Sequence, residues 1–104
     1  MSDFTISVVN DFHEKPFGRY RYEGGDSCAE VFREEHLIPA MQKYDHVVVD
    51  LSGYDYYGSS FLEETFRGLV RAGFSCEELN QKLKVVHTRL PSIEAEVLGY
   101  IKVT

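Results

Sequence analysis

The chain has 104 residues and a formal net charge of -6, so we expect residues 1–104 to form one small domain. This acidic balance repels phosphate backbones and argues against nucleic-acid binding, and no apolar run approaches the ~20 residues of a membrane span. Residues Met1 to Asn10 lack the pattern of a signal peptide, and Cys28 and Cys76 lie far apart. We therefore expect a cytoplasmic protein with reduced cysteines.

The first half of the chain predicts two strands and a helix. Alternating apolar and polar side chains over residues 4–8 indicate a strand with one buried face, and alternating Arg and Tyr over residues 19–22 indicate a short edge strand. A helix is predicted to begin at Ser27, because Ser27 and Glu30 have the spacing of a capping box. Pro39 falls inside the apolar pattern of this helix, so we expect a kink or a break there.

The second half predicts two further strands with a helix between them. The sequence HVVVDL over residues 46–51 is typical of a central parallel strand covered on both faces, and the apolar run over residues 83–87 predicts another buried strand. A helix is expected over residues 60–72, with Ser60 and Glu63 as a second capping box.

Spacing signals mark the remaining helical features. Glu63 and Arg67 are four residues apart, which favours an ion pair on one helix face. Ser75 and Glu78 predict a capped helical turn, and Pro91 is typical of the first residue of a last helix.

Together these elements predict an α/β fold with a small, mixed, largely parallel four-stranded sheet and three to four helices. Strands separated by helices pair in parallel through right-handed crossovers. In such sheets ligands and partners meet the loops that follow the carboxyl ends of the strands. Here these loops are residues 52–59 and 88–91.

The candidate catalytic groups lack the neighbours that chemistry requires. Ser59 lies at a strand–loop–helix junction, but the surrounding sequence lacks the G-x-S-x-G pattern of a nucleophile elbow. His46 and His87 are expected at the ends of strands, where a structural role is the simpler interpretation. We therefore expect no catalytic residues and no enzyme activity, unless a histidine lies within hydrogen-bond reach of Ser59.

Metal and nucleotide sites are not predicted either. Residues 13–14 and 34–36 contain ligand types, but their spacing does not bring several ligands to one helix face. Gly24 and Gly25 precede the first helix, but Asp26 and Glu30 would repel a phosphate there, and no glycine-rich nucleotide-binding motif is present. We expect no cofactor.

One segment carries features that a folded core does not require. Residues 50–64 read DLSGYDYYGSSFLEE, which combines carboxylates, aromatic rings, glycines and two hydroxyls at a helix start. A capping role explains Ser60 but leaves Ser59 without a structural role. This pattern favours a surface for a protein partner, and the exposed tyrosines and an edge strand also permit a homodimer. The candidate contact residues are Tyr56, Tyr57, Gly58, Ser60, Phe61 and Thr88.

The same segment resembles the STAS domains of sulphate transporters and anti-sigma-factor antagonists. The resemblance rests on VVVDLSG at residues 47–53, followed by GSSFL at residues 58–62. More specifically, the chain resembles a bacterial STAS-like domain family of unknown function over residues 4 to 103. The matching stretches are GRYR at 18–21, FREE at 32–35, LIPA at 37–40 and YGSSFLEE at 57–64.

The resemblance implies a regulatory binding module. In anti-sigma-factor antagonists the first serine of the Ser-Ser pair is phosphorylated by a serine kinase with the histidine-kinase ATPase fold, and the phosphorylated domain releases its partner. Ser59 holds that position, whereas Gly58 and Phe61 replace the acidic residue before the pair and the glycine after it. The alternative hypothesis is a sensor for a nucleotide or anion, bound in a crevice beside Ser59 and Thr88.

Overall fold

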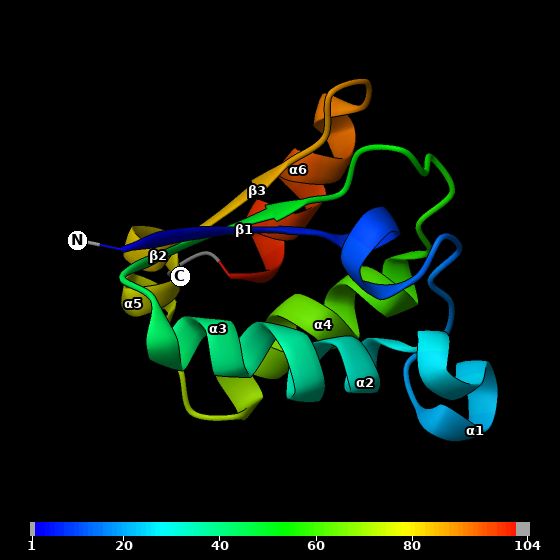
Figure 1. Cartoon of the computed structure of the whole chain (residues 1–104), viewed down its shortest axis with the longest axis horizontal. Helices are drawn as coiled ribbons and strands as arrows, with labels where there is room; N and C mark the ends of the chain where they lie inside the picture. Colours follow the sequence, from blue (N-terminus) through cyan, green and yellow to red (C-terminus); the bar gives the residue numbers. More distant parts are fainter. Residues whose placement is uncertain (1, 102–104) are drawn as a thin grey trace.

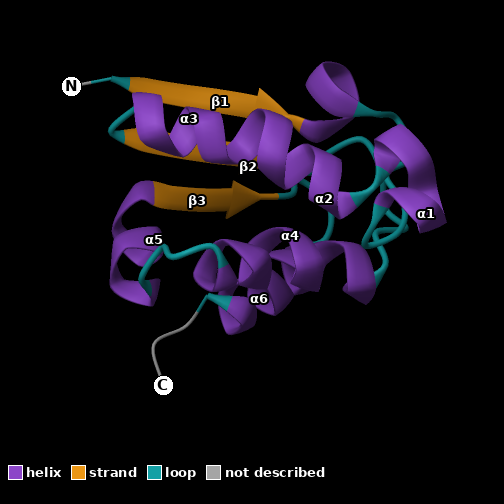
Figure 2. Ribbon diagram, turned by 90° about the horizontal axis from the view of Figure 1, so that it is seen from below, coloured by secondary structure: helices purple, strands orange, loops and turns teal. Residues whose placement is uncertain are grey.

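The computed structural model describes residues 2–101 and contains three strands, β1 (Asp3–Ser7), β2 (His46–Asp50) and β3 (Leu83–Val86). They form one sheet in the order β1-β2-β3, and both neighbouring pairs are parallel. Figures 1 and 2 show the three strands together, and the arrows in Figure 2 lie side by side and end at the same edge of the sheet. This edge is where the two loops of interest begin.

Residues 19–22 do not form the predicted fourth strand. A short helix, α1 (Arg21–Gly24), begins inside this segment. The carbonyls of Gly18 and Arg19 accept N–H groups from the first turn of the next helix. Because these main-chain groups are used there, the segment does not extend the sheet, which is parallel and three-stranded rather than mixed and four-stranded.

Six α-helices and three other helical turns complete the described part of the chain. The α-helices are α1 (Arg21–Gly24), α2 (Ala29–Phe32), α3 (Ile38–Lys43), α4 (Ser59–Arg71), α5 (Cys76–Lys82) and α6 (Pro91–Tyr100). The other turns are the π-helical η1 (Val8–Phe12) and η3 (Arg33–Leu37) and the 3-10 turn η2 (Gly25–Ser27). Within residues 2–101, none of these helices is long and apolar enough to cross a membrane.

Helices cover one face of the sheet. Figures 1 and 2 show α2, α3 and α4 on the same side of the strands. Val47 and Val49 of β2 are fully buried, whereas Val48 between them is only half-buried, so the expectation of cover on both faces is wrong. Both crossovers advance in the same direction across the sheet, and right-handed connections of this kind place their helices on one face.

The helix ends follow the sequence signals only in part. Ser75 accepts a hydrogen bond from the N–H of Glu78 (3.1 Å), and Pro91 is the first residue of α6, as predicted. The two other capping boxes are wrong. The Ser27 hydroxyl donates to a main-chain carbonyl three residues earlier (2.8 Å), and α4 begins after Gly58 without a side-chain cap.

The expected interruption near Pro39 is a π-helical turn. In η3 (Arg33–Leu37) the N–H of Ile38 donates to the carbonyl of Arg33. Pro39 follows this turn at the start of α3, and the helical path continues from η3 into α3. The chain therefore passes Pro39 without a break.

Candidate functional site

His87 ties together the loops that follow β2 and β3. Its side chain is buried, and its Nε2 lies 2.9 Å from the carbonyl oxygen of Tyr54 in the loop after β2. Its Nδ1 accepts hydrogen bonds from the N–H groups of Arg89 and Leu90, both at 3.2 Å. A carbonyl can only accept and an amide N–H can only donate, so these partners assign the proton to Nε2. The imidazole thus holds both loops in one arrangement.

Two of the predicted contact residues lie inside the fold. Tyr57 is 9% exposed and Phe61 1% exposed, and their rings pack together at 6.0 Å between centroids. The Tyr57 hydroxyl is buried without a hydrogen-bond partner among the described residues. Burial, together with nearby Asp50 and Tyr54, raises the pKa of this hydroxyl above its ordinary value. Both rings therefore support the loop from beneath and cannot form its contact surface: Phe61 is buried from the first turn of α4, and Tyr57 from the loop that precedes this helix.

The other predicted contact residues are exposed. Tyr56 is 82% exposed, and the remaining residues of this group also face solvent. We call these residues and the serine between them the loop surface. It consists of Tyr56, Gly58, Ser59, Ser60 and Thr88. Thr88 lies at the β3 end, where its N–H donates to the hydroxyl of Ser52 (3.0 Å).

Ser59 is the first residue of α4, a helix of 13 residues. Its N-cap is Gly58, which provides no side-chain hydrogen bond, and the first turn contains no acidic residue. The side chain of Ser59 is exposed and lies beside Tyr100, whose hydroxyl donates to Glu96 (2.6 Å). The start of α4 therefore presents a hydroxyl and free main-chain N–H groups to solvent.

One turn further along α4, two carboxylates are neutralised by three guanidinium groups. Arg33 Nη1 lies 2.9 Å from Glu64 Oε2 in a largely buried ion pair. Arg71 reaches both Glu63 (3.0 Å) and Glu64 (3.1 Å), and Arg19 also pairs with Glu63. The hydrogen bond from Arg71, helped by that from Arg19, holds the pKa of Glu63 below its ordinary range. The negative charge below the loop surface is therefore compensated.

The arginine cluster was not predicted from the sequence. The expected pair of Glu63 with Arg67 does not form, because Arg67 instead donates to the carbonyl of Tyr100 (2.6 Å). One signal was available in Gly68, a glycine in the middle of a helix. A Cβ at this position would lie 2.4 Å from Arg33 Nη1, so a larger residue would force the guanidinium to shift.

The described residues do not assemble catalytic or metal-binding groups around Ser59. His46 is near the opposite end of β2, with its Nδ1 3.0 Å from Asp3 Oδ1. His87 has both ring nitrogens engaged with main-chain groups. No cluster of three or more His, Cys, Asp and Glu side chains in residues 2–101 is arranged to hold a metal ion.

A shallow hollow of about 460 Å³ lies at the carboxyl edge of the sheet. Neither Ser59 nor Thr88 is among the residues that line it. Its lining includes two basic side chains, Lys15 and Arg89, and Arg89 also approaches Asp55 (3.4 Å). The hollow lies on the side of the loop that carries Tyr56.

Comparison with known proteins identifies a family for this chain. A family model described as a STAS-like domain of unknown function matches residues 29–92. The matched range runs from α2 into α6 and includes β2, β3 and α4, with both loops between them. No curated protein and no solved structure matches the chain.

Proposed function

Because the chain belongs to the family of STAS-like domains of unknown function, we propose that it is a cytoplasmic regulatory module that binds a protein partner through the loop surface. The observation that carries this proposal is the contrast between an exposed, hydroxyl-bearing surface and its buried support. Tyr56 and Ser59 are exposed, while Tyr57, Phe61 and His87 below them are packed and held. A rigid base of this kind lets a partner bind without paying to order the loop.

Phosphorylation of Ser59 is the proposed switch. A phosphate adds about −1.5 to −2 charge and three strong acceptor oxygens. The uncapped start of α4 favours an anion by up to ~1 kcal/mol when exposed. Glu63 lies one turn away, but Arg19 and Arg71 already compensate its charge. The fold therefore tolerates the modification, while a partner surface that fits the neutral hydroxyl is repelled.

The proposed partner is a serine kinase or other ATPase with the histidine-kinase fold. Affinity for such an ATPase from the same genome should be measured for Ser59→Asp, with Ser92→Asp as the matched control. Ser92 is also an exposed serine in the first turn of a helix, α6, but lies outside the loop surface. We expect Ser59→Asp to weaken binding by about tenfold or more and Ser92→Asp to leave it unchanged.

Two further results decide the proposal. Incubation of the protein with the ATPase and ATP should add one phosphate at Ser59, detected by peptide mass spectrometry, and Ser59→Ala should remain unmodified. Equal affinity of wild type and Ser59→Asp would exclude the switch. Binding unaffected by Tyr56→Ala and Thr88→Ala would exclude the loop surface as the contact site.

A second candidate function is a sensor for a small anion or nucleotide. The supporting observation is the hollow with Lys15 and Arg89 beside the exposed ring of Tyr56, at the edge where parallel sheets bind ligands. A ligand at a hundred times its dissociation constant stabilises the fold by about 2.7 kcal/mol. Thermal unfolding with inorganic phosphate and with ATP tests this function, and an unchanged midpoint in both would exclude it.

A further inference from the structure

The outer edge of β1 has main-chain groups available for another strand. The Ser2 carbonyl accepts two N–H groups at the start of β2. Main-chain groups alternate in direction along a strand, so those of Asp3, Thr5 and Ser7 face away from the sheet. The outward N–H of Ser7 is taken by Asp11 Oδ2 (2.8 Å). Asp3 and Thr5 therefore remain open to pairing.

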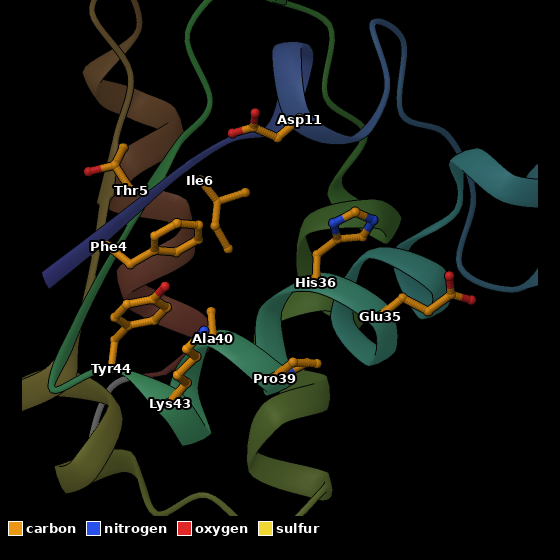
Figure 3. Close-up of a pocket in the computed structure, with 10 residues that line it drawn as sticks. All are labelled: Phe4, Thr5, Ile6, Asp11, Glu35, His36, Pro39, Ala40, Lys43 and Tyr44. Atoms are coloured by element: carbon orange, nitrogen blue, oxygen red, sulfur yellow. The ribbon is translucent and has the colours of Figure 1, made fainter. Parts of the chain in front are cut away.

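A groove with an apolar floor runs beside this edge. It has a volume of about 450 Å³ and lies between β1 and the helical segment formed by η3 and α3 (Figure 3). The rings of Phe4 and Tyr44 stack in it, with 4.6 Å between centroids and planes 7° apart, and Phe4 is 38% exposed. Ile6 and Ala40 contribute further apolar surface. An open strand edge beside apolar surface is the arrangement used to add a strand.

The charges of the groove are divided between its two ends. Lys43 lies at the end formed by Tyr44, whereas Asp11 and Glu35, which also pairs with Arg21 (2.7 Å), lie toward the other end (Figure 3). When a second copy pairs its β1 antiparallel to the first, the basic end of each groove lies beside the acidic end of the other. Such self-complementarity is what a two-fold symmetric interface requires. A strand from an unrelated protein would need to reproduce this division of charge.

We propose that the β1 edge is a homodimer interface, in which two copies pair antiparallel about Thr5. The two sheets then form one continuous sheet, and the exposed Phe4 rings of both copies become covered. Asp11 limits the pairing at Ser7. Asp3, which this pairing brings toward Asp11 of the second copy, has its Oδ1 3.0 Å from His46 Nδ1. The interface uses none of the loop-surface residues, so it is independent of the proposed function.

Sedimentation equilibrium of the full chain over a range of concentrations tests the interface. We expect a monomer–dimer equilibrium for wild type, and Lys43→Glu should raise the dimer dissociation constant about tenfold. Adding Glu35→Lys to Lys43→Glu should restore dimerisation, because the charge pattern becomes self-complementary again. Lys84→Glu is the matched control, since Lys84 is an exposed lysine on the other edge strand, β3, and should leave the dimer unchanged.

Thr5→Pro gives a second test, because it removes the outward N–H of Thr5. It should produce a monomer whose circular dichroism matches that of wild type; if this variant does not fold, the charge-reversal variants decide. A wild-type protein that stays monomeric at its highest soluble concentration overturns the proposal and leaves the groove to a strand of another protein. A dimer indifferent to Lys43→Glu also overturns it, since the contact then lies elsewhere.

Discussion

The loop surface and the β1 edge differ in what their main chains still require. At the loop surface, His87 and Ser52 satisfy main-chain groups of both loops, and the rings of Tyr57 and Phe61 are buried beneath the exposed ring of Tyr56. At the β1 edge, the main chain of Thr5 faces outward and the ring of Phe4 lies at the surface. The first region can therefore lose a partner without leaving main-chain groups unpaired, whereas at the second a partner strand would pair main-chain groups that otherwise face solvent. This difference favours a reversible contact at the loop surface and a long-lived contact at the β1 edge.

The largest expected difference between the regions is in the stability cost of removing a ring. Phe61→Ala should lower the free energy of unfolding by about 3–5 kcal/mol, because Phe61 is fully buried below the loop surface. Phe4→Ala should cost only about 1 kcal/mol in dilute, monomeric protein, because Phe4 is partly exposed and loses mainly its stack with Tyr44. Urea unfolding of both variants measures the difference.

Equal losses for the two variants would contradict this division into a packed base and an open edge. Tyr56→Ala provides the control for the exposed part of the loop surface. Its ring is 82% exposed, so the free energy of unfolding should change by no more than about 0.5 kcal/mol.

The next effect tests whether His87 holds the loop surface in place. His87→Ala removes the partner of three main-chain groups and should cost about 2–4 kcal/mol. Hydrogen exchange should become faster in residues 54–57 and 88–90, whereas the amides of β1 should be unaffected beyond the global loss. His46→Ala is the matched control, because His46 is exposed and should change stability by about 0.5 kcal/mol or less. Unchanged exchange in both loops would show that another contact positions them.

Local periodicity predicted the elements whose burial pattern is set within a few residues. The strands over residues 46–51 and 83–87 and the helix over 60–72 are confirmed within one residue at each end, because alternation and the helical stripe reflect burial directly. The strand predicted over residues 19–22 is wrong, because alternation there does not reflect burial. Their alternation of Arg and Tyr arises from side chains that reach ion-pair partners on helices, such as Arg21 with Glu35 (2.7 Å), and not from a pleated strand.

The site was only partly predictable, because its construction depends on contacts distant in sequence. Exposure of Ser59 followed from its place before an apolar helix. Phe61 is buried because the buried face of α4 is wider than an amphipathic pattern predicts. Glu64 also lies on that face. The burial of the Glu64 carboxylate depends on its ion pair with Arg33, which lies 31 residues earlier in the chain. No local spacing contains that information.

A smaller effect of opposite sign is expected at Tyr57. Its hydroxyl is buried without a partner in the described part of the chain, so Tyr57→Phe should leave stability unchanged or raise it by up to about 1 kcal/mol. Tyr100→Phe is the control, because the Tyr100 hydroxyl donates to Glu96 (2.6 Å) and its loss should cost about 0.5–1.5 kcal/mol. A clear loss on Tyr57→Phe would mean that a bound water or another group satisfies the hydroxyl. The base of the loop surface would then be less apolar than the buried rings of Tyr57 and Phe61 indicate.

The smallest effect is a pH dependence at Glu63, which links the loop surface to its compensating arginines. Hydrogen bonds from Arg71 and Arg19 hold the folded-state pKa of Glu63 below its ordinary value of 4.5. Glu63 therefore stabilises the fold above that value, and this contribution is lost as the pH falls through the lowered folded-state pKa. Both arginines are partly exposed, so the contribution should stay below about 1 kcal/mol.

Urea unfolding at neutral and acid pH measures this contribution. Glu63→Gln should be less stable than wild type at neutral pH, and the difference should shrink in acid. Glu14→Gln is the control, because it removes an exposed carboxylate that forms no ion pair within residues 2–101 and should change the free energy of unfolding by no more than about 0.5 kcal/mol. A Glu63→Gln difference that stays constant with pH would mean that the arginines do not hold this carboxylate. A phosphate on Ser59 would then meet an uncompensated charge one turn away, and the loop surface would lose the feature that lets it tolerate a switch.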